Sequence, residues 1–265
     1  MTGLEAVRWK LRQKRELHLS IFDLISERFD SSLREKNSND YFVNLPKTLL
    51  EKEYNLNIPV GILPRSLKEV LIDHVYERLP EFIPGPGDVV IDVGAQYGDY
   101  AYLCAKKFGA EVFAFEPLKK NYELMLEFLR INDVGNVHTY NMAIGAADGA
   151  FEISTDDIMM SSPDLTYETG KRHEMGEMRT LDSFKLKTPS IMKLDVEGFE
   201  IEVLQGSAET LKSRPKVIVE VHSKELRKQV VYHLYNLGYN LRHENAAKRS
   251  TRGRREVSEL YFSCN

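Results

Sequence analysis

This sequence has few of the features that mark secreted, membrane-spanning or nucleic-acid-binding proteins. Its 265 residues include two cysteines, Cys104 and Cys264, which form no metal or redox motif and cannot build a disulfide framework. No apolar run approaches the roughly 20 residues that cross a bilayer, and the charged N-terminus lacks the apolar stretch of a signal peptide. The formal net charge of -4 provides no basic field for nucleic acid. We therefore expect a cytoplasmic protein whose partner is neither a membrane nor a nucleic acid.

The hydrophobic share of 42% is enough for one full-sized core with an appendage. From Leu4 to Leu33, and again from Leu67 to Leu79, apolar residues recur at helical spacing, and Pro80 ends the second run. We expect residues 1–80 to form a helical N-terminal extension and residues 81–265 to form the main domain. The apolar stripes of the extension would cover that domain or pair two chains as a homodimer.

After the turn signal at 84–87, strand-like and helix-like segments alternate. The expected strands are Val89–Ile91, Glu111–Phe115, Val137–Ala143, Ile191–Leu194 and Val217–Val221, with a helix over Leu118–Ile131. This alternation predicts an α/β fold, a Rossmann-like and mostly parallel sheet with helices on both faces. Phe151–Ser154 reads as a short strand, Met159–Glu174 as a polar loop, and Ser258–Cys264 as an antiparallel closing strand.

The segment Asp92-Val93-Gly94-Ala95-Gln96-Tyr97-Gly98 follows the first strand directly. Its glycines let the backbone approach a ligand and turn into a helix whose first N–H groups are free. A dinucleotide site needs G-x-G-x-x-G, but Gln96 stands in place of the middle glycine, and no P-loop lysine is present. A ligand without phosphates fits better, and S-adenosylmethionine (SAM) is one. Asp92 would face its ammonium group, and the backbone of Gly94 and Ala95 its amino-acid part.

The acidic residue Glu116 ends the second strand, 22 residues beyond Gly94. A carboxylate in this place can accept hydrogen bonds from both ribose hydroxyls. The alternative is a glycine turn and a surface carboxylate in another kind of α/β protein. Asn141, Met142 and Ala143 end the third strand and would border the adenine, unless Met142 only fills core space.

Several motifs together resemble the FkbM family of methyltransferases. They are Asp92–Gly98, Phe115-Glu116-Pro117, Asn141–Gly145, Thr180–Ser183 and Lys193-Leu194-Asp195-Val196-Glu197-Gly198-Phe199-Glu200. The resemblance runs from about Asp88 to Glu220 and implies SAM as methyl donor. It also implies O-methylation of a hydroxyl group on a sugar, a polyketide or another small metabolite.

The resemblance also assigns individual residues. It places Pro117 at the cofactor and Ser161 and Ser162 in a loop where the family carries serine. Position 96, commonly Asn in the family, is Gln here, which should alter a contact with the cofactor rather than abolish binding.

Ionisable residues gather at the ends of two neighbouring strands. Lys193, Asp195 and Glu197 stand at every second position along one strand and the residues that follow it. Glu220 and His222 have the same spacing at the end of the next core strand. The carboxyl ends of these strands face the cofactor crevice, so we interpret Lys193, Asp195, Glu197 and His222 as catalytic.

Methyl transfer to oxygen is helped by a base. We slightly favour His222 over Asp195 as that base, because the ordinary pKa of histidine is nearest neutrality. Lys193 would orient Asp195. The alternatives are catalysis by proximity alone and a purely structural Lys193–Asp195 ion pair, with Glu197 capping a helix. Asp195, Glu197, Glu220 and His222 have the chemistry of metal ligands but no diagnostic spacing, so we assign no metal.

A basic stretch stands near the C-terminus: Lys248, Arg249, Arg252, Arg254 and Arg255. It is a solvated loop or a surface that attracts an anionic acceptor. The leading hypothesis is a SAM-dependent O-methyltransferase acting on a small molecule with a hydroxyl group. The rivals are an RNA methyltransferase, a non-catalytic SAM-binding protein and, more weakly, a dehydrogenase.

Overall fold

The computed structural model describes residues 50–51, 55–62, 64–154, 173–245, 248–249 and 256–264, all of which belong to one unit, Lys47–Asn265. Three groups of predictions lie outside the part so described. They are the helices expected before Leu33 with the homodimer contact through them, the residues Ser161 and Ser162, and the basic side chains between Lys248 and Arg255, since only the backbone of 248–249 is described. None of the described helices is long and apolar enough to cross a membrane.

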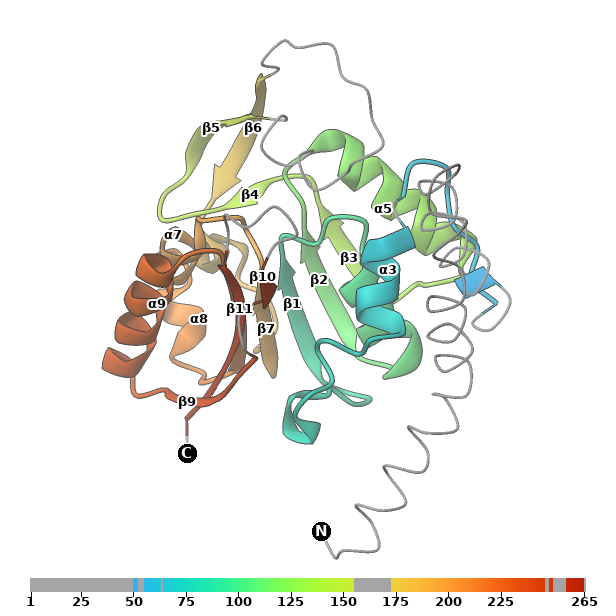
Figure 1. The fold of residues 1–265 in the computed structure, drawn as a ribbon. Helices are drawn as coiled ribbons and strands as arrows, with labels where there is room; N and C mark the ends of the chain where they lie inside the picture. Colours follow the sequence, from blue (N-terminus) through green and yellow to red (C-terminus); the bar gives the residue numbers. More distant parts are fainter. Residues whose placement is uncertain are drawn as a thin grey trace, which may run out of the picture. The chain divides into compact units, whose positions relative to one another are not determined.

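A twisted sheet forms the centre of the molecule (Figure 1). Its parallel strands are β1 (Val89–Val93), β2 (Glu111–Phe115), β3 (Val137–Tyr140), β7 (Ile191–Leu194) and β8 (Lys216–Val221), in the order β3-β2-β1-β7-β8. Strand β11 (Glu256–Ser263) runs antiparallel to β8 and pairs in turn with β9 (Asn240–Glu244) and β10 (Lys248–Arg249). The described residues thus confirm the Rossmann-like α/β fold with an antiparallel closing strand.

Helices cover both faces of the sheet, because each central strand is apolar on both sides. One face carries α3 (Pro64–Leu71), α4 (Asp99–Tyr102), a π-helical turn (Leu103–Lys107) and α5 (Lys119–Ile131). The other carries α7 (Glu200–Gln205), α8 (Ala208–Leu211) and α9 (Lys224–Asn236), which stand together in Figure 1. Short 3-10 turns lie at Pro80–Phe82 and Leu181–Phe184. Successive side chains alternate between the faces, so Val90 packs with the first group of helices and Ile91 with the second.

The helix expected over Leu67–Leu79 is shorter than predicted. It ends at Leu71, and His74 adopts a φ of +53°, which no continuing right-handed helix allows. The chain from there to Phe82 is irregular but not peripheral. Val75 and Tyr76 are buried in the same core as α3 and the sheet. The proposed boundary at residue 80 thus separates segments that share one core.

The strand expected over Val137–Ala143 is divided. β3 ends at Tyr140, and β4 (Ala143–Ile144) joins a second, smaller sheet with β5 (Gly149–Ser154) and β6 (His173–Arg179), in the order β4-β6-β5. The end of the loop predicted over Met159–Glu174 was therefore wrong, because β6 begins at His173. Its partner β5 confirms the short strand expected near Phe151.

Candidate functional site

The loop Gly94–Gly98 leaves the end of β1 and is tied to the end of β2. The N–H groups of Gly94 and Ala95 both donate to the carbonyl of Phe115, each at 3.0 Å. Gly94 has a φ of +80°, and a Cβ there would overlap the carbonyl oxygen of Asp195, with the carbonyl carbon 2.8 Å away. A glycine is therefore required at this position by the protein's own backbone, because the ends of β1, β2 and β7 converge on it.

Glu116 lies against this loop. Its Oε2 accepts a hydrogen bond from the N–H of Gln96 at 2.9 Å, and its Oε1 accepts one from Leu118 at 3.0 Å. Burial raises the pKa of Glu116 to about 7, although these two N–H groups act to lower it. Oε1 also accepts a hydrogen bond from Asn121 Nδ2 at 3.4 Å, whereas Oε2 keeps a second lone pair for a further donor. The contact with a ribose stays a prediction.

Ser66, on α3, holds the same loop from the other side. Its hydroxyl donates to Gln96 Oε1 at 3.2 Å and also bonds Asp99 Oδ2. Asp99 is buried at the start of α4, and burial raises its pKa. No sequence motif links Ser66 to a loop 30 residues away, so its contact with the loop was not predicted.

A row of ionisable side chains crosses four neighbouring strands on the face that carries α3. Asp92 is in register with Lys193, and Glu220 with Glu259. Lys193 Nζ lies 3.2 Å from Asp92 Oδ1 and 3.6 Å from Asp195 Oδ2. Burial acts to lower the pKa of Lys193, but Asp92 and Asp195 outweigh burial and raise it. The lysine is therefore a buried cation with two carboxylate partners, of which the sequence suggested only Asp195.

Asp92 is fully buried, and its Oδ2 has no hydrogen-bond partner among the described residues. Burial raises the pKa of Asp92 to about 6, while Lys193 acts to lower it. A buried carboxylate oxygen without a partner, next to the glycine loop, suits a ligand that carries a positive charge.

His222, Asp195 and Glu197 meet just beyond the ends of β7 and β8. His222 Nε2 lies 3.6 Å from Asp195 Oδ1 and 3.7 Å from Glu197 Oε2. Burial acts to lower the pKa of His222, but Asp195 and Glu197 outweigh burial and raise it to about 9. Asp195 is the reverse case: burial acts to raise its pKa, but Lys193 and His222 lower it below its usual value. The imidazole thus carries a proton at neutral pH and the Asp195 carboxylate is ionised.

A strained turn sets the position of Glu197. Glu197 and Gly198 have φ values of +53° and +116°, and the N–H of Gly198 donates to Glu200 Oε1 at 3.1 Å. Glu200 is fully buried at the start of α7. A non-glycine residue in the left-handed region costs on the order of 1–3 kcal/mol, and such residues cluster at functional sites.

Tyr76 closes the cluster from the segment after α3. Lys193 Nζ lies 5.4 Å from the centre of its ring, and the ring meets Tyr100 edge-on at 4.9 Å. Burial, followed by Glu220 and Asp195, raises the pKa of Tyr76. No sequence pattern points to Tyr76, because its position in the cluster depends on tertiary packing alone.

The residues expected at the adenine do not end one strand, since β3 stops at Tyr140. Asn141 Nδ2 donates to the carbonyls of Glu116 at 2.9 Å and Pro117 at 3.0 Å, which fixes the turn after β2. Met142 is half-buried against the core, and Ala143 begins β4. A contact of Pro117, Met142 or Ala143 with a cofactor stays a prediction.

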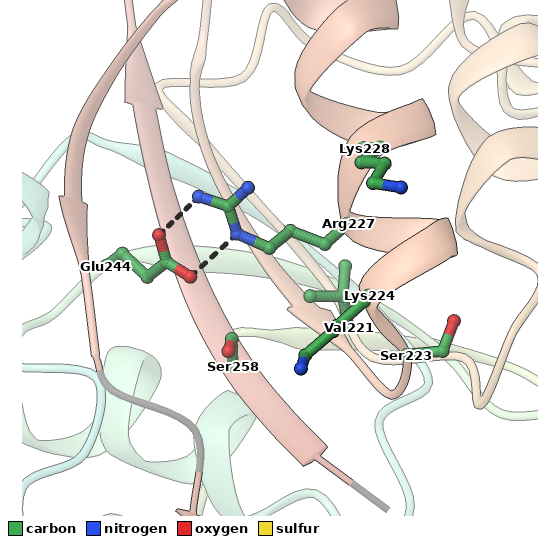
Figure 2. A pocket seen from close by; sticks show the side chains of 7 residues that line it. All are labelled: Val221, Ser223, Lys224, Arg227, Lys228, Glu244 and Ser258. Carbon is green, nitrogen blue, oxygen red and sulfur yellow. Dashed lines mark hydrogen bonds and ion pairs between the residues drawn. The ribbon is translucent and has the colours of Figure 1, made fainter.

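A separate pocket of about 330 Å³ lies on the side of the sheet that carries α9 (Figure 2). It is lined by Val221, Ser223, Lys224, Arg227, Lys228, Glu244 and Ser258. Figure 2 shows Arg227 directed at Glu244, with two hydrogen bonds of 2.7 and 2.6 Å. Glu244 thereby neutralises the guanidinium, and the pocket contains none of the residues expected at the site.

Two solved structures share the fold. An FkbM methyltransferase from Methylobacillus flagellatus superposes with a TM-score of 0.52 and 17% identity, over 84% of this chain and 52% of that one. A methyltransferase from Pyrococcus furiosus gives a TM-score of 0.51 and 15% identity, over 84% and 96%. At such identities the likeness shows the fold alone.

Sequence relatives are more specific. The hexuronic acid methyltransferase AglP of Haloferax volcanii is 31% identical over 149 residues, which are 51% of this chain and 56% of the relative. Methyltransferase 1 of Beauveria bassiana is 24% identical over 165 residues, 52% and 65% of the two chains. This chain thus spans between about half and two thirds of these relatives. Residues 92–241, more than half of the chain, match the methyltransferase FkbM domain. The protein therefore belongs to the FkbM methyltransferase family.

Proposed function

We propose that the protein uses SAM to methylate a hydroxyl group of a sugar. The observation that carries this proposal is the joining of the glycine loop to Glu116 by the hydrogen bond from Gln96. The loop and the carboxylate are the two parts of a nucleoside site, and here they form one rigid unit at the carboxyl ends of β1 and β2. The absence of a middle glycine at Gln96 favours a ligand without phosphates.

The side chains at this crevice fit a cationic donor. Asp92, Asp99 and Asp195 lie around one buried cation, Lys193, so carboxylates outnumber positive charges. Asp92 and the backbone at Gly94 would hold the amino-acid part of SAM. The ribose would be held by Gln96, Gly98 and Glu116. The adenine would be held by Pro117, Met142 and Ala143. When bound, SAM supplies an electrophilic methyl group on a sulfonium centre.

Asp195 and His222 are the groups available to the acceptor hydroxyl. Both stand at the carboxyl ends of strands adjoining β1, and Asp195 is 27% exposed, so a substrate can reach it. Lys193 orients the Asp195 carboxylate by pairing with its other oxygen. A sugar acceptor is supported by the relative from Haloferax volcanii, which is named a hexuronic acid methyltransferase.

The test has two stages. Isothermal titration measures SAM binding, and incubation with methyl-tritiated SAM then measures transfer to neutral sugars, uronic acids and total RNA. We expect saturable SAM binding and label in a sugar. No SAM binding at millimolar concentration contradicts the proposal. Label in RNA would favour an RNA methyltransferase. Binding of SAM without methyl transfer to any acceptor would favour a non-catalytic SAM-binding protein.

A further inference from the structure

Three potential metal ligands converge beyond the ends of β7 and β8. One donor atom from each of Asp195, Glu220 and His222 lies within 4.8 Å of the other two. The separation of 3.6 Å between Asp195 Oδ1 and His222 Nε2 is too long for a hydrogen bond. Ligand atoms around an ion with metal–ligand distances of about 2.1 Å lie roughly 3 to 3.5 Å apart. Asp195 Oδ1 and His222 Nε2 are thus close to the separation of two ligands of one ion, and Glu220 lies within 4.8 Å of both.

Two of these donors lack a hydrogen bond within the described structure. His222 Nε2 is buried without a hydrogen-bond partner among the described residues. Glu220 likewise makes no hydrogen bond or ion pair with any residue that the structure describes. A buried polar atom left without a partner costs about 1–3 kcal/mol, so an ion shared with these carboxylates would stabilise the buried nitrogen of His222.

The neighbouring charges leave room for a cation. Lys193 approaches Asp195 through Oδ2, which leaves Oδ1 on the side of His222. Glu197 Oε2 lies 3.7 Å from the same imidazole nitrogen and adds a fourth donor within reach. Glu259 stands in register with Glu220 and increases the negative charge of the cluster.

We propose that Asp195, Glu220 and His222 form a binding site for a divalent metal ion, which would displace the proton that His222 carries in its absence. Two carboxylates and one imidazole suit a first-row ion such as Mn²⁺ or Zn²⁺ rather than Ca²⁺, which prefers an all-oxygen set. Three protein ligands leave coordination positions open, as in catalytic metal sites. The role of the ion rests on the proposed function: at this place it would hold an oxygen of the acceptor beside the methyl donor.

The experiment titrates the full-length, chelator-treated protein with Mn²⁺ and follows the electron paramagnetic resonance signal of the free ion. We expect loss of the free signal at about one ion per chain. Glu220→Gln and His222→Gln, each of which removes one donor, should weaken Mn²⁺ binding by about tenfold or more. Glu259→Gln is the matched control, because it removes a neighbouring carboxylate and no ligand, and it should change the affinity less than about threefold.

Thermal unfolding and SAM titration, both in the presence of chelator, show whether each variant is folded. An unchanged free Mn²⁺ signal with the wild-type protein overturns the proposal. So does binding to both donor variants with wild-type affinity, or an equal loss in Glu259→Gln, which would show a general attraction to negative charge. Failure of SAM to bind would contradict the proposed function but not the metal site, because the Mn²⁺ titration contains no SAM.

Discussion

At the scale of single residues, Gly94 carries the sharpest constraint in the site. It combines a φ of +80° with the carbonyl of Asp195 in the space where a side chain would begin. We predict that Gly94→Ala lowers the free energy of unfolding by about 3 kcal/mol or more and abolishes measurable SAM binding, because the end of β7 must move. Urea denaturation and isothermal titration measure the two effects.

Gly87 provides the control for that substitution. Its φ is +91°, but a Cβ there would meet nothing within 4 Å. Gly87→Ala therefore isolates the backbone strain, which we expect to cost about 1–2 kcal/mol while SAM binding is unchanged. Equal losses of stability in the two variants would show that the contact with Asp195 is relieved without cost.

We predict that Glu116 makes SAM binding depend on pH. Burial, the largest influence on this carboxyl, raises its pKa to about 7, so a fraction of the free protein carries a proton there at neutral pH. The ionised carboxylate accepts hydrogen bonds from ribose hydroxyls more strongly than the protonated carboxyl group does. SAM affinity should therefore rise as the pH increases through 7, by up to about tenfold per unit on the acid side, and then level off.

Titrations between pH 6 and 8.5 measure this dependence, and Glu116→Gln is its control. The variant cannot ionise, so its weaker affinity should lose this part of the pH dependence. Asp92, whose pKa is about 6, remains in both proteins and cancels in the comparison. The same pH profile in both proteins would remove Glu116 from the site.

At the scale of elements, α3 connects a segment outside the family match to the glycine loop, Gly94–Gly98. Ser66 bonds Gln96 and Asp99, so it fixes a loop residue that has a left-handed φ of +48°. We predict that Ser66→Ala raises the SAM dissociation constant about threefold to tenfold, the equivalent of one hydrogen bond. Ser213→Ala, whose hydroxyl is exposed and bonds only Thr210 within the described structure, should leave it unchanged. Isothermal titration of both variants with SAM measures the two dissociation constants, and equal values would contradict the role of Ser66.

The elements that the sequence predicted well are those whose surroundings are uniform. Glu111–Phe115 and Ile191–Leu194 were predicted to the residue, because strands buried on both faces read as continuous apolar runs. The end of α3, the break after Tyr140 and β6 depend on partners distant in sequence, and local patterns do not encode them. The site follows the same division: motifs identified Gly94, Glu116 and Asp195, but not the contacts of Ser66 and Tyr76.

At the scale of the whole molecule, the region that matches the family is framed by segments on either side of it. Tyr261, in β11, is fully buried, and its hydroxyl donates to the carbonyl of Val75 at 2.8 Å. Its ring also meets Phe82 edge-on at 5.3 Å. Both partners precede residue 92 and Tyr261 follows residue 241, so segments from the two sides of the matched region meet in the core, next to β8.

Because of this contact, we predict that the single hydroxyl group of Tyr261 contributes measurably to the stability of the fold. Tyr261→Phe keeps the ring but leaves the buried carbonyl of Val75 without its donor, and should lower the free energy of unfolding by about 1–3 kcal/mol. Tyr122→Phe makes the same change where the hydroxyl lies 3.4 Å from Thr139 in a partly buried place, and should cost less than about 1 kcal/mol. Urea denaturation of both variants tests this. If the two losses are equal, the hydrogen bond between Tyr261 and Val75 contributes nothing beyond an ordinary, partly exposed bond.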